Sequence, residues 1–279
     1  MKKLILLLAL ILVVASGAQN ARSEGKTDLS HKDKAVALIR SIESGDSGPV
    51  SYVNPEKYIQ HNLLVADGLA GFGAALAQLP AGSAKARVVR AFQDGEYVFL
   101  HTEYDFFGPK AGFDIFRFEN GLIVEHWDNL QAIAPANPAG RTQFDGPTSV
   151  ADRDKTEENK TLVKGFVKDV LMGGNPGKIT DYIVPAYTQH NPAIGDGLEA
   201  LGVALKAMAD AGTPMIYTAN HMILGEGNFV LSVSEGEFLG KPSAFYDLFR
   251  VENGKLVEHW DSIEEILPRD AWKNGNGKF

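Results

Sequence analysis

Histidine and aspartate stand close together at two places in this chain of 279 residues. His126 lies two residues before Asp128, and His259 lies two residues before Asp261, with a tryptophan between them each time. Residues two apart in a strand share a face. An imidazole and a carboxylate on one face can bind and release protons near neutral pH. The sequence therefore offers two candidate sites for acid–base chemistry.

Each His-Trp-Asp triplet ends a longer motif that occurs twice. Residues 114–128 read Asp-Ile-Phe-Arg-Phe-Glu-Asn-Gly-Leu-Ile-Val-Glu-His-Trp-Asp, and residues 247–261 repeat most of these positions. The Asn-Gly pair favours the tight turn of a β-hairpin. Upstream, Gln-His-Asn also occurs twice, at 60–62 and 189–191. The copies are about 130 residues apart, whereas solenoid repeats run roughly 20 to 50 residues, so we predict a tandem duplication of two complete domains.

Both halves are predicted to begin with helices. Ser30 is the expected start of the first helix, and a matching helix begins near Thr156. A short second helix is expected to carry Tyr58 and His61, and a third to cover residues 67–79. Only strand patterns follow, at residues 87–92, 97–106, 113–118 and 122–130. Helices followed by strands indicate an α+β fold class, with helices packed on one face of an antiparallel sheet.

The domain boundaries follow from these patterns and from a segment rich in Pro, Gly, Ser and Thr without apolar periodicity. The predicted segments are a signal peptide at 1–18, domain 1 at 30–134, a linker at 135–154, domain 2 at 155–268 and a C-terminal tail at 269–279.

The first residues are typical of an export signal. A basic start is followed by an unbroken apolar run from Leu4 to Val14, and Ser16 and Ala18 have the spacing that a signal peptidase reads. We expect cleavage after about Ala18 and a periplasmic or secreted protein. The run is shorter than the roughly 20 residues of a spanning helix, so no stable membrane insertion is expected after cleavage. An uncleaved anchor is the alternative.

The composition limits the partners and cofactors. The chain is 44% hydrophobic and 22% charged, with a formal net charge of −8 and no densely basic stretch, so we expect no nucleic-acid partner. The absence of cysteine excludes disulfides, thiol catalysis and a lipoprotein anchor. There is no nucleotide-binding glycine motif after a strand. We therefore expect no cofactor.

The sequence also offers residues that could bind a metal ion. His61, His126 and Asp128 could supply two imidazoles and one carboxylate. Against this, the chain lacks His-x-x-x-His spacing and cysteine. We therefore predict no metal ion.

The motifs also resemble a known family. Helices first and a curved sheet afterwards, with Tyr-Ile-Gln-His-Asn, Asp-Gly, Asp-Ile-Phe-Arg and Gly-Leu-Ile-Val-Glu-His-Trp-Asp, are similar to the SnoaL-like polyketide cyclases of the nuclear transport factor 2-like superfamily. The resemblance covers about 30–130 and 156–263. The Gln-His-Asn and Glu-His-Trp-Asp motifs resemble a subgroup described as predicted aldol-condensation enzymes. The resemblance implies two cone-shaped domains with metal-free sites, although the superfamily also contains non-catalytic binding modules.

Aldol ring closure needs a base beside a carbonyl, a donor for the enolate oxygen and an apolar cavity. Strand alternation places Asp114 with Phe116 and Phe118, and burial among aromatic rings would raise the pKa of such a carboxyl and make it a usable base. The predicted catalytic residues are Asp114, His61, His101, Asp247 and His190. The predicted ligand-binding residues are Tyr58, Asn62, Phe116, His126, Asp128, Tyr187, Asn191, His259 and Asp261.

Structural roles compete with these assignments. The paired aspartates of the strands could cap a strand end or bind an arginine, and the histidines of Gln-His-Asn could bind backbone groups. We favour packing roles for the His-Trp-Asp ends, because tryptophan is a large packing residue. Asp67 and Asp196 precede helices and are interpreted as helix caps.

Three functions remain open. The chain could be an enzyme acting on a small carbonyl compound, a binding protein for a small apolar ligand, or an intramolecular pseudo-dimer that also forms larger oligomers. His101 aligns with Val233, so the halves differ. We therefore expect domain 1 to hold the more active site, with Asp114 and His61 together. A pocket that holds a carboxylate with a strongly shifted pKa would favour the enzyme, an equally closed but uncharged pocket the binding protein, and filled cavities the structural role.

Overall fold

The computed structural model describes residues 29–79 and 82–279, so the predicted signal peptide lies outside the described residues. Helix α1 (His31–Ser44) begins as expected, because the Ser30 side chain accepts a hydrogen bond from the Asp33 N–H. Its buried face is formed by Ala35, Leu38 and Ile39. Within the described residues, no helix is long and apolar enough to cross a membrane.

Domain 1 continues as a sheet behind the helices. A 3₁₀-helix (Gly48–Tyr52) is followed by β1 (Ile59–Gln60), α2 (Gly68–Leu76), β2 (Lys85–Asp94), β3 (Tyr97–Asp105), β4 (Pro109–Glu119) and β5 (Leu122–Ala132). The strand order is β1-β5-β4-β3-β2. The hairpin turn between β4 and β5 has positive φ angles at Asn120 and Gly121, as the Asn-Gly pair predicts.

Domain 2 repeats this arrangement with the strand order β6-β10-β9-β8-β7. Its helices are α3 (Thr156–Phe166), which runs into a π-helical turn (Val167–Leu171), α4 (Ile179–Tyr182) and α5 (Gly197–Asp210). Its strands are β6 (Ile183–Gln189), β7 (Ile216–Glu226), β8 (Phe229–Phe238), β9 (Lys241–Glu252) and β10 (Lys255–Glu265). Short 3₁₀-helices occur at Arg153–Lys155, Pro176–Lys178 and Arg269–Ala271.

Three local predictions are wrong. The expected second helix is absent, because Ile59 and Gln60 form backbone pairs with β5 and become a parallel edge strand, which makes each sheet mixed rather than purely antiparallel. Helix α2 ends at Leu76 instead of 79, since the Gln78 and Leu79 amides bond carbonyls three residues back. The Asp67 carboxylate sits before the helix but accepts from the Gln60 N–H at 2.9 Å and not from a helix amide.

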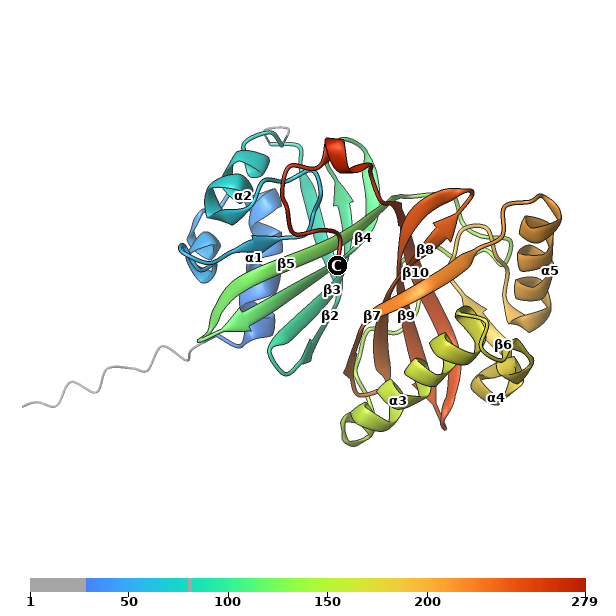
Figure 1. The fold of residues 1–279 in the computed structure, drawn as a ribbon. Coiled ribbons are helices and arrows are strands. Elements are labelled where there is room, and N and C mark those ends of the chain that lie inside the picture. Colours follow the sequence, from blue (N-terminus) through green and yellow to red (C-terminus); the bar gives the residue numbers. More distant parts are fainter. Residues whose placement is uncertain (1–28, 80–81) are drawn as a thin grey trace, which may run out of the picture.

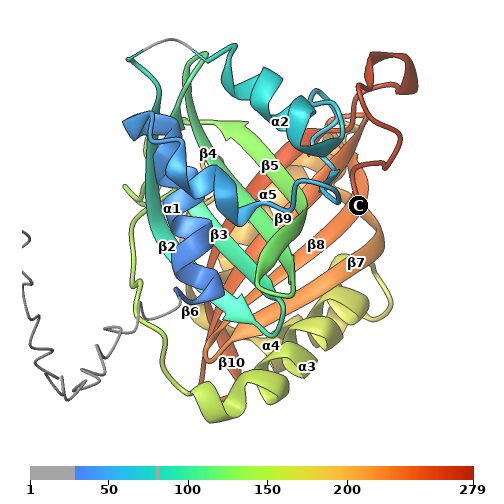
Figure 2. The ribbon, with the colours of Figure 1, turned by 90° about the vertical axis from the view of Figure 1, so that its left-hand side faces the viewer.

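The two sheets pack face to face, with the helices on their outer sides (Figures 1 and 2). The shared core between them is aromatic and aliphatic; it includes Phe92, Phe99, Phe113, Ile115 and Trp127 from domain 1 and Phe229, Leu231, Tyr246, Leu248 and Trp260 from domain 2. Separate clusters lie under the helices of each domain. Each sheet is therefore covered on both faces, as the apolar residues on both sides of the strands predicted.

Reciprocal contacts relate the domains by a pseudo-twofold axis. The Leu130 N–H donates to the Glu264 carboxylate at 3.2 Å, and the Ile263 N–H donates to the Gln131 amide oxygen at 2.9 Å. Leu130 and Ile263 occupy matching positions of β5 and β10, as do Gln131 and Glu264. An interface is isologous when equivalent residues of the two units make the same contacts with each other. The fold class is confirmed as α+β, with two five-stranded sheets, each preceded by helices.

Candidate active site

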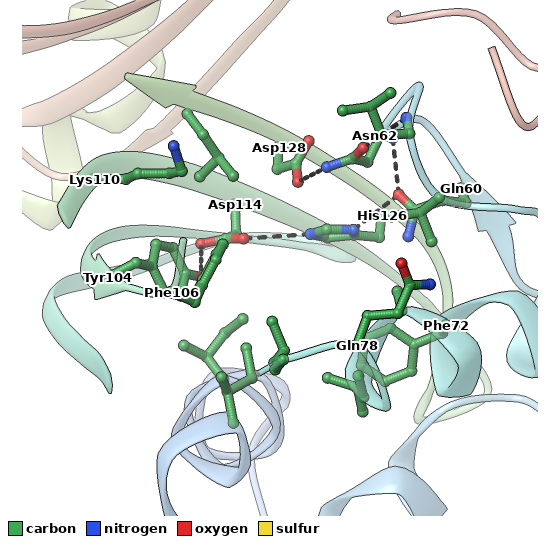
Figure 3. Close-up of a pocket in the computed structure, with 18 of the residues that line it drawn as sticks. Gln60, Asn62, Phe72, Gln78, Tyr104, Phe106, Lys110, Asp114, His126 and Asp128 are labelled. Atoms are coloured by element: carbon green, nitrogen blue, oxygen red, sulfur yellow. Dashed lines mark hydrogen bonds and ion pairs between the residues drawn. The ribbon is translucent and has the colours of Figure 1, made fainter. Parts of the chain in front are cut away.

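A cavity of about 490 Å³ lies in domain 1, between the helices and the sheet (Figure 3). Its wall is mainly apolar; the lining includes Leu38, Ile39, Ile42, Val65, Phe72, Leu76, Phe106, Phe116 and Leu130. Polar side chains come from β1 and the residues beside it, from the sheet, from the residues after α2 and from the C-terminal segment; they are Tyr58, Gln60, Asn62, Gln78, Tyr104, Lys110, Asp114, His126, Asp128, Glu264 and Lys273. A largely apolar cavity of this size with a few convergent polar groups is typical of a small-molecule site.

Asp114 lies at the centre of a buried hydrogen-bond network. Its Oδ2 accepts from the Tyr104 hydroxyl at 2.6 Å and from the Thr102 hydroxyl at 3.3 Å, and its Oδ1 lies 3.3 Å from His126 Nε2. Burial and the neighbouring Asp114 charge raise the pKa of Tyr104 well above its usual value, so Tyr104 stays a donor. Most acceptor positions of Asp114 are thus occupied by the protein itself (Figure 3).

The protonation of His126 is set by Gln60. The Gln60 amide oxygen accepts from the Asn62 N–H at 2.9 Å and also lies 3.0 Å from His126 Nδ1. Since that oxygen can only accept, His126 Nδ1 must carry a proton. Nε2 therefore faces Asp114 either as a second donor or as the acceptor of a proton from the carboxyl group. His126 and Asp114 consequently share one exchangeable proton at the cavity wall.

Two polar atoms beside this pair have no hydrogen-bond partner. They are the Tyr58 hydroxyl and Asp128 Oδ1, both buried, on side chains that line the cavity. The other Asp128 oxygen accepts from the Asn62 side-chain amide at 2.6 Å. Burial raises the pKa of Tyr58, as do the charges of Asp128 and Asp114, against a smaller opposite effect of Gln60. Tyr58 is thus a neutral donor, and Asp128 Oδ1 is an acceptor that no hydrogen bond occupies, with the Lys278 ammonium 3.8 Å away.

His61 does not lie beside Asp114, so the expected pairing of these two residues is corrected. The His61 ring stacks on Trp127 with centroids 4.6 Å apart, and its nitrogens lie 3.0 Å from the Glu125 carboxylate and from the Gly277 carbonyl. Glu125 and Trp127 flank His126 in β5 and point to the opposite face. The suggested metal set of His61, His126 and Asp128 is therefore not brought together.

His101 is also on the other face of the sheet. In the β3–β4 register Leu100 pairs with Asp114, so alternation turns His101 away from the cavity. Its ring stacks on Phe113, and its Nδ1 lies 3.1 Å from the Arg90 guanidinium. Burial lowers the pKa of His101 well below its usual value, and the Arg90 charge adds to this. His101 is thus a neutral histidine of the interdomain core.

Domain 2 contains a related network. His259 Nε2 lies 3.0 Å from Asp247, and its Nδ1 lies 2.9 Å from the Gln189 oxygen. Asn191 donates to Asp261 Oδ2 at 2.6 Å, while Asp261 Oδ1 has no partner. The expected ligand residue Tyr187 stacks against the His259 ring. His190 stacks on Trp260 and lies 2.9 Å from Glu258. These contacts match those of His61 in domain 1, so His190 is not part of the His259–Asp247 network.

The protonated form of His259 is favoured in this network. Burial alone would lower its pKa, but the hydrogen bond that His259 donates to Asp247 and the charges of both aspartates outweigh burial and raise it. Burial raises the pKa of the Asp261 carboxyl. Among the residues with described placement, Asp247, His259 and Asp261 form the one group of three side chains close enough to hold a cation. A cation there would have to replace the proton shared by His259 and Asp247.

Several residues of the network were missed from the sequence. Gln60 and Gln189 orient the histidines, and Glu125 and Glu258 bind the histidines of the other face. All four stand in the repeated motifs, so their recurrence was the available signal. Tyr104 carried no such signal. Its counterpart in domain 2 is Tyr217, which reaches Asp247 from a different strand.

Comparison with known proteins gives partial matches. No family model matches this chain, and a search of curated proteins gave no significant match. A nuclear transport factor 2-like protein of unknown function from Cytophaga hutchinsonii is 14% identical, with a TM-score of 0.34 over 38% of this chain and 95% of that one. IdmH from Streptomyces antibioticus, described as a candidate polyketide cyclase, is 20% identical, with a TM-score of 0.31 over 38% and 92%. A candidate polyketide cyclase from Acidithiobacillus ferrooxidans is 17% identical, with a TM-score of 0.31 over 41% and 91%.

Proposed function

We propose that domain 1 binds a small, largely apolar carbonyl compound and transfers protons on it, as in enolisation, isomerisation or aldol-type ring closure. The supporting observation is the pair of unpaired buried atoms, the Tyr58 hydroxyl and Asp128 Oδ1, in the wall of one apolar cavity. Leaving a buried polar atom without a partner costs about 1–3 kcal/mol. A ligand oxygen and an acidic C–H group would supply the missing partners.

The contacts suggest a role for each side chain. Asp128 Oδ1 is free to accept a proton from the carbon next to the carbonyl, whereas Asp114 is occupied by Tyr104, Thr102 and His126. The Tyr58 hydroxyl donates to the resulting enolate oxygen. When the enolate carbon attacks a second carbonyl, the proton shared by His126 and Asp114 passes to the new alkoxide. Proton return from Asp128 to His126 then restores the starting state.

Deuterium exchange tests this proposal. Full-length protein is incubated in D₂O with β-dicarbonyl and polyketide-like compounds, and loss of enolisable protons is followed by NMR. Asp128→Asn is nearly isosteric, and it should slow exchange by about 10² to 10⁴-fold because the general base is lost. Asp261→Asn in domain 2 is the matched control and should leave exchange near the wild-type rate.

The outcomes separate the alternatives. Undiminished exchange in Asp128→Asn would remove this residue from the mechanism. Binding of compounds without any exchange would favour a ligand-binding module, and the absence of both across the screen would favour a purely structural pseudo-dimer.

We also propose that the protein is exported to the periplasm or beyond. The basis is the basic start, the apolar run and the small residues Ser16 and Ala18. Intact-mass measurement of protein from the cell envelope fraction should show a chain that begins near Gln19. Full-length protein recovered from the cytoplasm would contradict export.

A further inference from the structure

The segment after β10 leaves domain 2 and packs on domain 1. This segment, residues 267–279, is called here the C-terminal arm and appears in red beside α2 and β5 in Figures 1 and 2. Its Asn274 side chain donates to the Asn62 carbonyl at 2.7 Å, and the Asn276 side chain donates to the Gln60 carbonyl at 3.0 Å. The arm is thus fixed to the segment that supplies polar groups to the cavity.

The arm places one buried cation beside the cavity. Lys278 is only 5% exposed. Its ammonium donates to the Asp128 carbonyl at 2.8 Å, pairs with the Glu264 carboxylate and lies 3.8 Å from Asp128 Oδ1. Burying an ammonium costs several kcal/mol unless opposite charges compensate. Two carboxylates of the cavity wall compensate this charge: Glu264 is the nearer one, and Asp128 Oδ1, assigned above as the proton acceptor, is the second.

The segment that follows β5 makes a different set of contacts with domain 2. Residues 134–146, which follow β5, pack on domain 2; the Thr142 carbonyl lies 2.8 Å from His190 Nδ1, and Arg141 pairs with Asp196. These contacts correspond to those of Gly277 and Asn276 on domain 1. At the position of Glu264, however, the uncharged Gln131 is found. The contact of Asn191 with Asp261 repeats that of Asn62 with Asp128.

We infer that Lys278 is a positioning residue of the domain 1 site, and that its ammonium keeps Asp128 ionised beside the apolar cavity. This inference rests on the proposed function. The candidate site is then formed by both domains, because domain 1 supplies the acceptor and the C-terminal arm supplies the charge that favours its anionic form. Other ionisable groups around this cavity are Asp114, His126, Glu264, Lys110, Lys273 and the phenols of Tyr58, Tyr104 and Tyr246.

A direct titration tests this without any substrate. The side-chain carboxyl carbon of Asp128 is followed by ¹³C NMR in the full-length protein as a function of pH. Lys278→Met should raise the titration midpoint of Asp128 by about one pH unit or more, because an opposite charge close by favours the ionised form. Lys278→Arg should keep the midpoint near that of the wild type. Lys278→Gln replaces the methionine variant if the latter does not fold.

Asn276→Ala is the matched control. It removes two anchoring hydrogen bonds of the same arm, to Gln60 and Asp67, but keeps the ammonium. Its Asp128 midpoint should stay within a few tenths of a unit of the wild type. An equal shift in Asn276→Ala and Lys278→Met would overturn the inference, because it would show that coverage by the arm matters and the charge does not.

The exchange assay then connects the charge to function. Lys278→Met should lose exchange activity at low pH and recover it as pH rises past the higher midpoint of Asp128. An unchanged midpoint in folded Lys278→Met would sink the inference whatever the exchange rates are. A shifted midpoint together with full exchange in Asp128→Asn would instead reject the proposed function and with it the functional meaning of Lys278.

Discussion

Domains 1 and 2 share the His–Asp network but differ in the space around it. Gly112 in β4 and Phe245 in β9 occupy matching positions opposite Leu130 and Ile263. Alternation places each on the same face as the aspartate two residues on. A Cβ at Gly112 would lie 2.4 Å from the Leu130 side chain, whereas the Phe245 ring is fully buried and stacks on Tyr217 at 4.3 Å. In domain 1 the Leu130 side chain therefore occupies the space beside Gly112, whereas in domain 2 the Phe245 ring occupies the matching position.

The donor to the central aspartate has also changed strand. In domain 1, Tyr104 of β3 pairs with Ala86 of β2; in domain 2, Tyr217 of β7 pairs with Gly236 of β8. The hydroxyl reaches the carboxylate in both cases, at 2.6 Å from Tyr104 and at 3.2 Å from Tyr217. A duplicated polar network can therefore persist while the residues packed beside it differ between the two copies.

The largest expected effect comes from removing the buried Phe245 ring from domain 2. Phe245→Ala should lower the free energy of unfolding by about 3–5 kcal/mol, because it leaves a cavity where a buried ring packed. Urea unfolding measures this loss. The variant should also gain binding of a small apolar probe in domain 2. A loss under about 1 kcal/mol would mean that the ring is not an essential part of that core.

The two tyrosines provide the next comparison. Tyr104→Phe removes a short bond to Asp114, and Tyr217→Phe removes a longer one to Asp247. Hydrogen bonds to charged groups contribute about 1.5–3 kcal/mol, so we expect Tyr104→Phe to reach this range and Tyr217→Phe to fall below it. Equilibrium unfolding of both variants measures the two losses of stability. Equal losses would show that the difference in length has no energetic meaning.

The raised pKa of His259 predicts that the free energy of unfolding depends on pH through a group in domain 2. Its pKa is raised in the folded protein, so its contribution to stability is complete below its ordinary value of about 6.5 and is lost as pH rises through the raised pKa. The unfolding free energy of the wild type should decline over this window. His259→Gln should show a shallower decline. An equally steep curve in the variant would assign the pH dependence to other groups.

The smallest expected difference concerns the two tryptophans of the repeated motif. Trp260 Nε1 donates to the Asp145 carbonyl at 2.9 Å, whereas Trp127 Nε1 is buried without a partner. Replacement by phenylalanine removes similar packing at both positions. Trp260→Phe should therefore cost about 0.5–1.5 kcal/mol more than Trp127→Phe, the net value of one hydrogen bond. Thermal unfolding of the pair checks this, and the reverse order would contradict it.

Local signals in the sequence were sufficient for most of the fold. The Asn-Gly turns, the alternating strands and the Ser30 cap each depend on neighbours along the chain, and the structure confirms them. Strand β1 could not be predicted in this way, because two residues become a strand only through pairing with β5, which lies more than 60 residues away.

The candidate site was predictable in part for the same reason. Alternation alone placed His126 with Asp128, and Asp114 with Phe116, and all four side chains line the cavity. The directions of His61 and His101 depended on register and on a partner from the other domain. Lys278 was not predicted at all, since its contacts join residues 150 positions apart. Long-range contacts of this kind leave no periodic pattern in a sequence.

The exchange of arms has a consequence for how the chain unfolds. Each arm bonds the histidine of the opposite domain, through Gly277 to His61 and through Thr142 to His190, and the sheets share one apolar core. Loss of either domain would expose that core and release the arm that holds the other. The two halves should therefore melt in a single cooperative transition, and a chain cut after residue 266 should lose protection of amide hydrogens in domain 1 first, although the cut lies in the sequence of domain 2.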